Sequence, residues 1–170
     1  SKILDKIRFN KKEERLFNIF NFSVPRSGST KLINLFKASC EYYEILERVN
    51  FSKEHPDSFI PRLSKLRLLS NISDKTLFIS SQRYFLTNLQ SFSREQSKYN
   101  NISFDEHLCR LQIDNFKNQR KLEIEVLKSL LKNKSTIIIY DYKYLSESNN
   151  NDLIKQCIKI IEEFLNYNNI

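Results

Sequence analysis

The sequence predicts an α/β domain with a mainly parallel β-sheet flanked by helices on both faces. Apolar runs rich in aromatic and β-branched residues, the usual composition of strands, occupy residues 16–24, 76–80 and 136–145. The segments between and after them carry apolar residues at helical spacing. Strands that alternate with helices favour a parallel sheet. With 170 residues, 40% of them hydrophobic, one domain spanning 1–170 is expected.

The elements of the first half follow from these patterns. After a charged N-terminal helix or arm, the first strand is expected to lead into a first helix with Leu32, Ile33 and Phe36 on one face. A short second strand, a loop with two of the three prolines and a further helix should follow. The expected bounds are 1–15 for the arm, 16–24 and 29–40 for the first strand and helix, 41–45 for the second strand, 55–61 for the loop and 62–69 for the helix.

The second half should contain two more strands and three helices. The strand at 76–80 should run into a helix over about 84–95. A capping-box pattern at 103–106 opens a helical stretch toward Lys132, which is expected to break near residues 115–118. A strand from residue 136 and an asparagine turn at 149–151 come next, and Asn151 or Asp152 should cap the last helix.

Gly28 is the only glycine of the chain, where average usage of about 7% would give roughly a dozen. It lies between the first strand and the first helix, in the run Pro-Arg-Ser-Gly-Ser-Thr at 25–30. Glycine is needed where the backbone takes a positive φ or approaches a ligand closely. A strand, a tight loop and a helix N-terminus together present backbone N–H groups to a phosphate.

This run resembles the 5′-phosphosulfate loop of the sulfotransferase superfamily, whose members use 3′-phosphoadenosine 5′-phosphosulfate (PAPS). The resemblance implies a three-layer, P-loop-NTPase-like sulfotransferase fold, PAPS as cofactor and no metal. It also implies that the loop N–H groups hold the phosphosulfate and that the Arg26 guanidinium neutralises it during transfer. The cofactor-binding residues implied in this loop are Arg26, Ser27, Gly28, Ser29 and Thr30.

A second segment, residues 74–83, resembles the strand of the family that runs into the 3′-phosphate site. The family pattern has an arginine at the strand end and a serine eight residues later. One register puts Ser80 in the place of that arginine and Asn88 in the place of the serine, with Arg83 as a second arginine. A shifted register makes Arg83 the first arginine and Ser91 the serine. The sequence leaves both registers open.

Sulfuryl transfer to a hydroxyl needs a general base. Residues 42–46 resemble the aromatic–Glu–Pro–Leu segment of carbohydrate sulfotransferases, which implies Glu44 as the base, with Glu47 as an alternative. Residues 53–56 resemble two family patterns, a Lys-x-His motif whose histidine is the base and a Lys-x-Pro segment whose lysine steadies the bridging oxygen. Lys53 fits both patterns and His55 is the second candidate base, whereas His107 is expected to be structural.

Composition adds weaker constraints. The formal net charge of +8 favours an anionic ligand such as PAPS, an anionic acceptor or nucleic acid. The three cysteines lack metal-ligand spacing and are expected to be reduced thiols of a cytoplasmic protein, without zinc. The charged start of the chain lacks an apolar signal region, and no apolar run is long enough to span a membrane.

The predicted function is therefore transfer of a sulfuryl group from PAPS to a hydroxyl of a carbohydrate or another polar acceptor. One alternative is a kinase-like nucleotide-binding enzyme, although the loop has Ser29 where a Walker A lysine would stand. The one possible Mg²⁺-binding acid at a strand end is Asp141. Another alternative is a non-catalytic basic module that binds nucleic acid, although no aromatic–basic RNA motif or recognition helix is apparent.

Overall fold

The computed structural model of the chain describes residues 16–56, 75–100, 110, 112–132 and 135–170. Several expectations fall outside these ranges: the N-terminal arm, the loop beyond Pro56, the helix at 62–69, the capping box at 103–106 with His107, and Cys109.

The described part of the chain contains a sheet of four parallel strands. They are β1 (Phe17–Phe22), β2 (Val49–Glu54), β3 (Thr76–Gln82) and β4 (Thr136–Asp141). Their order across the sheet is β2-β1-β3-β4, so β1 lies in the interior and pairs with β2 and β3. All strand pairs are parallel, and all four strands therefore end at the same edge of the sheet. The predicted α/β class with a parallel sheet is confirmed.

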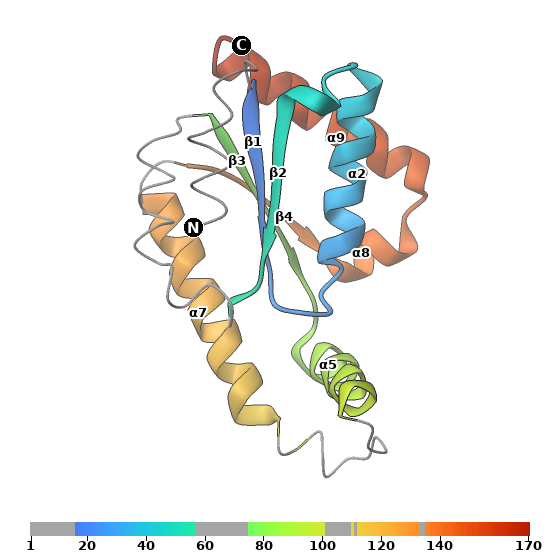
Figure 1. Ribbon diagram of the computed structural model, residues 1–170, viewed down its shortest axis with the longest axis vertical. Helices are drawn as coiled ribbons and strands as arrows, with labels where there is room; N and C mark the ends of the chain where they lie inside the picture. Colours follow the sequence, from blue (N-terminus) through green and yellow to red (C-terminus); the bar gives the residue numbers. More distant parts are fainter. Residues whose placement is uncertain (1–15, 57–74, 101–109, 111, 133–134) are drawn as a thin grey trace.

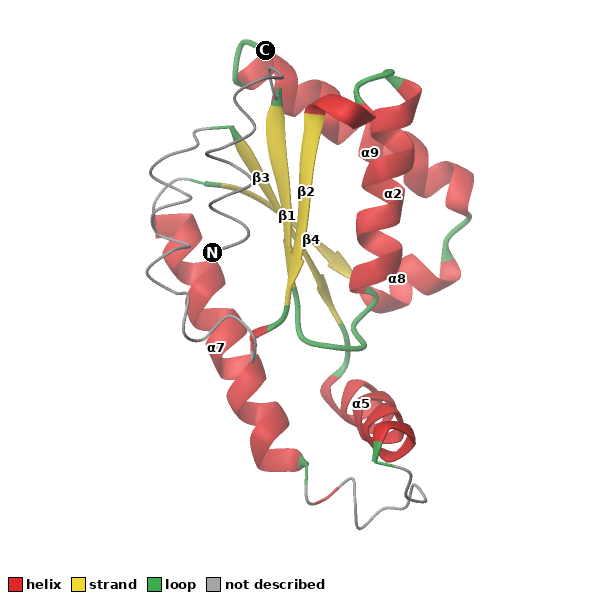
Figure 2. Ribbon diagram, viewed as in Figure 1, coloured by secondary structure: helices red, strands yellow, loops and turns green. Residues whose placement is uncertain are grey.

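Helices flank the sheet (Figures 1 and 2). The helix α2 (Ser29–Tyr42) and the C-terminal α9 (Asn150–Tyr167) pack together on one side, and α7 (Ile113–Lys132) lies on the other. The helix α5 (Phe85–Tyr99) lies beyond the carboxyl ends of the strands. Short helices, η1 (Leu46–Arg48) and α8 (Tyr142–Glu147), precede β2 and follow β4.

The larger core lies between the sheet and the helices α2 and α9. The phenylalanine and leucine positions that predicted the first strand and helix are buried here: the Phe17 ring lies 5.1 Å from the ring of Phe164, and Leu32 and Phe36 are fully covered. Burying one such side chain stabilises the fold by about 1.5–3 kcal/mol. This core fixes β1 against α2, and with them the loop that joins the two.

The short strand expected at residues 41–45 is absent, which corrects the sequence prediction. The helix α2 continues to Tyr42, and Glu44 then takes a left-handed conformation with φ of 56°. The Ile45 N–H donates to the Cys40 carbonyl at 3.0 Å, the bond that closes a Schellman helix end. Glycine usually occupies the left-handed position at the end of a helix. Because Glu44 occupies it here, the sequence did not indicate where α2 ends. The second strand is β2, four residues later.

Two expectations about the late helices are also wrong. Rather than breaking near residues 115–118, α7 is continuous, because Phe116 and Gln119 are buried while Asn115 and Asn118 face solvent. Packing of the apolar face outweighs the weak helix propensity of asparagine. The last helix is capped by Asn149, whose side-chain oxygen accepts from the Asn151 N–H at 2.8 Å, not by Asn151 or Asp152.

Candidate functional site

The loop between β1 and α2 has an unusual backbone. Arg26 has φ of 62° and Gly28 has φ of 92°, both in the left-handed region that L side chains rarely adopt. A Cβ on Gly28 would lie 3.1 Å from the Cδ2 atom of Tyr142 at the start of α8. The single glycine is therefore required both for the turn and for the close approach of Tyr142.

Hydrogen bonds of buried hydroxyl and amide groups fix this loop to the ends of the strands. The Ser27 hydroxyl donates to the Val24 carbonyl at 2.8 Å and lies 3.0 Å from the Ser81 hydroxyl at the end of β3. The Asn21 amide donates to the Ser29 carbonyl at 3.1 Å. Ser27 is thus fully buried and lies outside the cavity lining, so this predicted cofactor-binding residue supports the loop from inside the fold.

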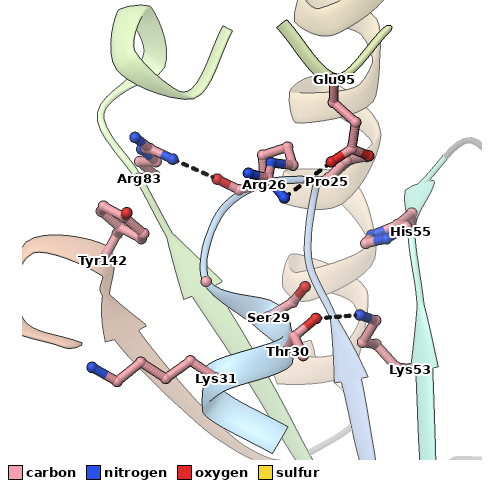
Figure 3. Close-up of a pocket in the computed structure, with 11 residues that line it drawn as sticks. Pro25, Arg26, Ser29, Thr30, Lys31, Lys53, His55, Arg83, Glu95 and Tyr142 are labelled. Atoms are coloured by element: carbon pink, nitrogen blue, oxygen red, sulfur yellow. Dashed lines mark hydrogen bonds and ion pairs between the residues drawn. The ribbon is translucent and has the colours of Figure 1, made fainter. Parts of the chain in front are cut away.

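A cavity of about 300 Å³ opens above the loop at the carboxyl ends of the strands (Figure 3). The loop and the first turn of α2 form its floor. Lys53 reaches it from β2, and His55 and Arg83 directly follow the ends of β2 and β3. Glu95 reaches it from α5 and Tyr142 from α8. The structure thus brings together five elements around the one glycine.

The charges around the cavity favour an anion. The Lys53 ammonium donates to the Thr30 hydroxyl at 2.7 Å, which holds it over the first turn of α2. No described side chain caps α2, and no acidic residue lies in its first turn. The first N–H groups of a helix lack intrahelical acceptors and carry partial positive charge. Helix and lysine therefore present positive charge at one place.

His55 lies in the cavity wall with a defined tautomer. Its Nδ1 atom is 2.8 Å from the Ser23 carbonyl oxygen. A carbonyl oxygen can only accept, so Nδ1 carries a hydrogen, and in the neutral ring Nε2 is the nitrogen with the lone pair. A neutral His55 can therefore act as a proton acceptor at Nε2.

Arg83 lies beside the loop and is held on several sides. Its Nη1 donates to the Arg26 carbonyl at 2.9 Å, and its guanidinium lies 4.0 Å from the centre of the Tyr142 ring. Arg120 of α7 donates to the Arg83 carbonyl at 3.0 Å. The buried Arg83 Nε has no hydrogen-bond partner among the described residues, and Arg83 forms part of the cavity wall.

Of the two registers proposed for the second segment, the structure brings Arg83 and Ser91 to the loop. Ser91 accepts from the Arg26 Nε at 3.1 Å. Ser80 is buried and accepts from the Gln82 amide, and the buried Asn88 donates to the Pro25 carbonyl at 2.8 Å. Ser80, Asn88 and Ser91 all lie outside the cavity lining, which includes only Arg83 of this segment.

Two carboxylates at the site were missed by the sequence reasoning. Glu95 lines the cavity, and its Oε2 atom is 3.0 Å from the Arg26 Nη1. Glu123 of α7 is completely buried and accepts from the Val24 N–H at 2.6 Å and from the Gln82 amide at 2.7 Å. Burial raises the pKa of Glu123, partly offset by those two hydrogen bonds and by Arg120. The spacing of Asn88, Ser91 and Glu95 along one helical face was the available signal.

The structure does not bring Glu44 or Glu47 to the cavity. Both are exposed and lie after the C-terminal end of α2, whereas the loop precedes its N-terminus. A 14-residue helix spans about 21 Å at 1.5 Å per residue. The expected placement of Glu44, after a short strand and facing the transferred group, is therefore corrected: it lies at the opposite end of α2.

Other candidate groups have structural surroundings. Asp141 accepts from the Tyr144 N–H at 3.3 Å and caps α8. Cys40 and Cys157 are free, buried thiols, and burial raises their pKa to about 12 and about 11. In the described ranges, His, Cys, Asp and Glu form no group of three that could hold a metal. Within the same ranges no helix is both long and apolar enough to cross a membrane.

No protein-family model matches the chain, and comparison with curated proteins found no match either.

Proposed function

We propose that the protein is a PAPS-dependent sulfotransferase of the P-loop-like type that transfers a sulfuryl group to a hydroxyl acceptor. One observation carries the proposal: the Pro-Arg-Ser-Gly-Ser-Thr loop opens a helix at the carboxyl edge of a parallel sheet, where Lys53 and Arg83 meet it at one cavity. In sheets of this kind, ligands bind at that edge.

The donor set suits an anionic cofactor with separate phosphate groups. The N–H groups of the loop and of the first turn of α2, with Arg26 and Lys53, would hold the 5′-phosphosulfate. Arg83, which lines the cavity, would hold the 3′-phosphate. PAPS supplies the activated sulfuryl group, which passes in line between two oxygens, so the protein contributes positioning and charge stabilisation.

The acceptor side of the reaction falls to His55 in this proposal. Its Nε2 would take the proton of the acceptor hydroxyl as the new sulfur–oxygen bond forms, while Nδ1–H stays on the Ser23 carbonyl. Lys53 would donate to the oxygen that stays with the cofactor as the old bond breaks. The prediction of a carbohydrate acceptor depended on the segment around Glu44, which lies away from the cavity. The proposed acceptor class is therefore hydroxyl compounds in general.

Ligand-dependent thermal stability tests this function directly. The product 3′-phosphoadenosine 5′-phosphate (PAP), ATP with Mg²⁺ and a short oligonucleotide would each be titrated against the protein. At about 100 times its Kd, PAP should stabilise the fold by about 2.7 kcal/mol. ATP should stabilise it much less, because it lacks the 3′-phosphate that Arg83 would bind. Equal or greater stabilisation by ATP would favour the kinase-like alternative, and stabilisation by the oligonucleotide alone would favour the nucleic-acid-binding module.

A further inference from the structure

We propose that Ser91 and Glu95 are positioning residues, through which α5 sets the orientation of the Arg26 guanidinium at the anion site. The inference rests on the proposed function only in that the cavity binds an anion. Neither residue is assigned contact with the transferred group. Both act on the ligand through Arg26.

The first argument is the conformation of Arg26. A non-glycine residue with φ of 62° has a strained backbone, which persists only when its surroundings fix it. The described surroundings do so. Arg83 donates to the Arg26 carbonyl at 2.9 Å, and Asn88 donates to the carbonyl of Pro25 at 2.8 Å. The backbone that carries the arginine is thus tied to α5 and to the turn before it.

The second argument is the face that α5 turns toward the loop. Asn88, Ser91 and Glu95 follow one another at spacings of three and four, which places them on one side of the helix. Asn88 binds the backbone before Arg26, and Ser91 and Glu95 bind its side chain at 3.1 and 3.0 Å. Two positions of this helical face therefore bind the Arg26 side chain, and the third binds the carbonyl of Pro25 directly before it (Figure 3 shows Glu95 turned toward Arg26).

The third argument is the geometry of the guanidinium. Ser91 accepts from the Arg26 Nε–H, and Glu95 pairs with the Arg26 Nη1. The helix α5 thus engages two adjacent donor atoms of the planar guanidinium, which carries five N–H donors. The remaining N–H groups stay in the plane that these two contacts define. A guanidinium that is already oriented loses less side-chain entropy when it binds an anion. This gain opposes the repulsion that the Glu95 carboxylate, one-third exposed, exerts on the same anion.

A double-mutant cycle tests the proposal. PAP and inorganic pyrophosphate would be titrated by calorimetry against the wild type, Glu95→Ala, Ser91→Ala, Arg26→Ala and the two double variants with Arg26→Ala. Gln90→Ala is the matched control, since Gln90 is exposed on the same helix and outside the cavity lining. Thermal melts of each variant would separate lost folding from lost binding.

We expect Glu95→Ala to weaken binding about fivefold to tenfold in the wild-type background and less than twofold when Arg26 is already alanine, a coupling of ordinary size for residues in contact. Ser91→Ala should show the same pattern with a smaller loss, and Glu95→Gln, which keeps an acceptor oxygen, should retain part of the affinity. Gln90→Ala should bind like the wild type.

The outcomes separate this inference from the function it rests on. If PAP does not bind but pyrophosphate shows the coupling, the PAPS assignment fails and the positioning role stands. Tighter anion binding in Glu95→Ala would mean that Glu95 competes with the ligand. If the affinity losses of Glu95→Ala and Arg26→Ala simply add in the double variant, Glu95 acts independently of Arg26. Either result overturns the inference, as does a wild type that binds neither anion.

Discussion

The Nζ of Lys53 and the Oγ1 of Thr30 lie 2.7 Å apart, although the residues are 23 positions apart in the sequence. Lys53 is near the end of β2, and Thr30 is in the first turn of α2. The parallel pairing of β1 with β2, in which Asn21 is the partner of Lys53, brings the lysine to the edge where the loop begins. A cation held at a helix N-terminus has no carboxylate to neutralise it in this contact, so it is ready for an anionic ligand.

Replacing Lys53 by methionine should therefore weaken anion binding and leave the fold intact. Methionine keeps the length of the side chain and removes the ammonium, which is exposed. A hydrogen bond to a charged group contributes about 1.5–3 kcal/mol, so the Kd for PAP should rise roughly 10- to 100-fold. Lys37→Met is the control, because Lys37 lies over the Phe51 ring, away from the cavity. Equal Kd values for the two variants would remove Lys53 from the site.

Gly28→Ala should destabilise the protein by about 1–3 kcal/mol in urea denaturation, because a Cβ is strained at φ of 92°. Part of the loss should come from Tyr142, whose Cδ2 would lie 3.1 Å from the new Cβ. In a Tyr142→Ala background the same substitution should therefore cost less, while a φ penalty remains. Asn34→Ala, on the exposed face of α2, should stay within about 0.5 kcal/mol of the wild type. If Gly28→Ala unfolded at the same urea concentration as the wild type, the loop would have to adopt another conformation.

The sequence could predict the parts of the fold that depend on local apolar periodicity. The aromatic run of β1 and the spacing of Leu32 and Phe36 gave the strand, the loop and the helix, because this pattern directly records which side faces the core. The stop of α2 was missed because Glu44 occupies the left-handed position that glycine normally marks. In a chain with one glycine, such stops carry little local signal, and β2 was consequently placed too early.

The candidate site was predictable where it is local and not where it is built across the sheet. The residues of the loop are contiguous, so one motif was sufficient to find them. Glu95 and Glu123 reach it from α5 and α7, more than 60 residues away in the sequence. Nothing near Glu123 in the sequence distinguishes it from a solvated helix carboxylate, and only its spacing from Asn88 and Ser91 on α5 marks Glu95. Only the packing of the two helices against the ends of β1 and β3 shows where they lie.

The buried Glu123 should give the stability a particular pH dependence. Burial raises its pKa in the folded protein above the ordinary value near 4.5, so the folded state binds the proton more tightly than the unfolded state. The resulting stability is fully present below the unfolded pKa and is lost as pH rises through the folded pKa. Measured by urea denaturation between pH 4 and 8, the wild type should thus lose stability relative to Glu123→Gln as pH rises.

The opposite trend would be a wild type whose stability increases relative to Glu123→Gln as pH rises. It would show that Arg120 and the two hydrogen-bond donors lower the pKa of Glu123 more than burial raises it. Glu125→Gln provides the matched comparison, since Glu125 is an exposed carboxylate on the same helix. Its difference from the wild type should change little over this pH range.

Three substitutions test which residue acts as the general base of the proposed sulfuryl transfer. His55→Ala should lower sulfuryl transfer by about 10²–10⁴-fold, the usual cost of removing a general base, and should leave the Kd for PAP nearly unchanged, because the base acts on the acceptor. Glu44→Gln and Glu47→Gln should transfer at the wild-type rate, since both carboxylates lie at the far end of α2. Turnover and PAP binding would be measured separately on each variant.

Loss of turnover in Glu44→Gln with an active His55→Ala would reverse the assignment and would require the loop and the end of α2 to meet during the reaction. If all three variants remain fully active, the proton leaves by another route, and His55 serves only to hold the Ser23 carbonyl beneath the loop.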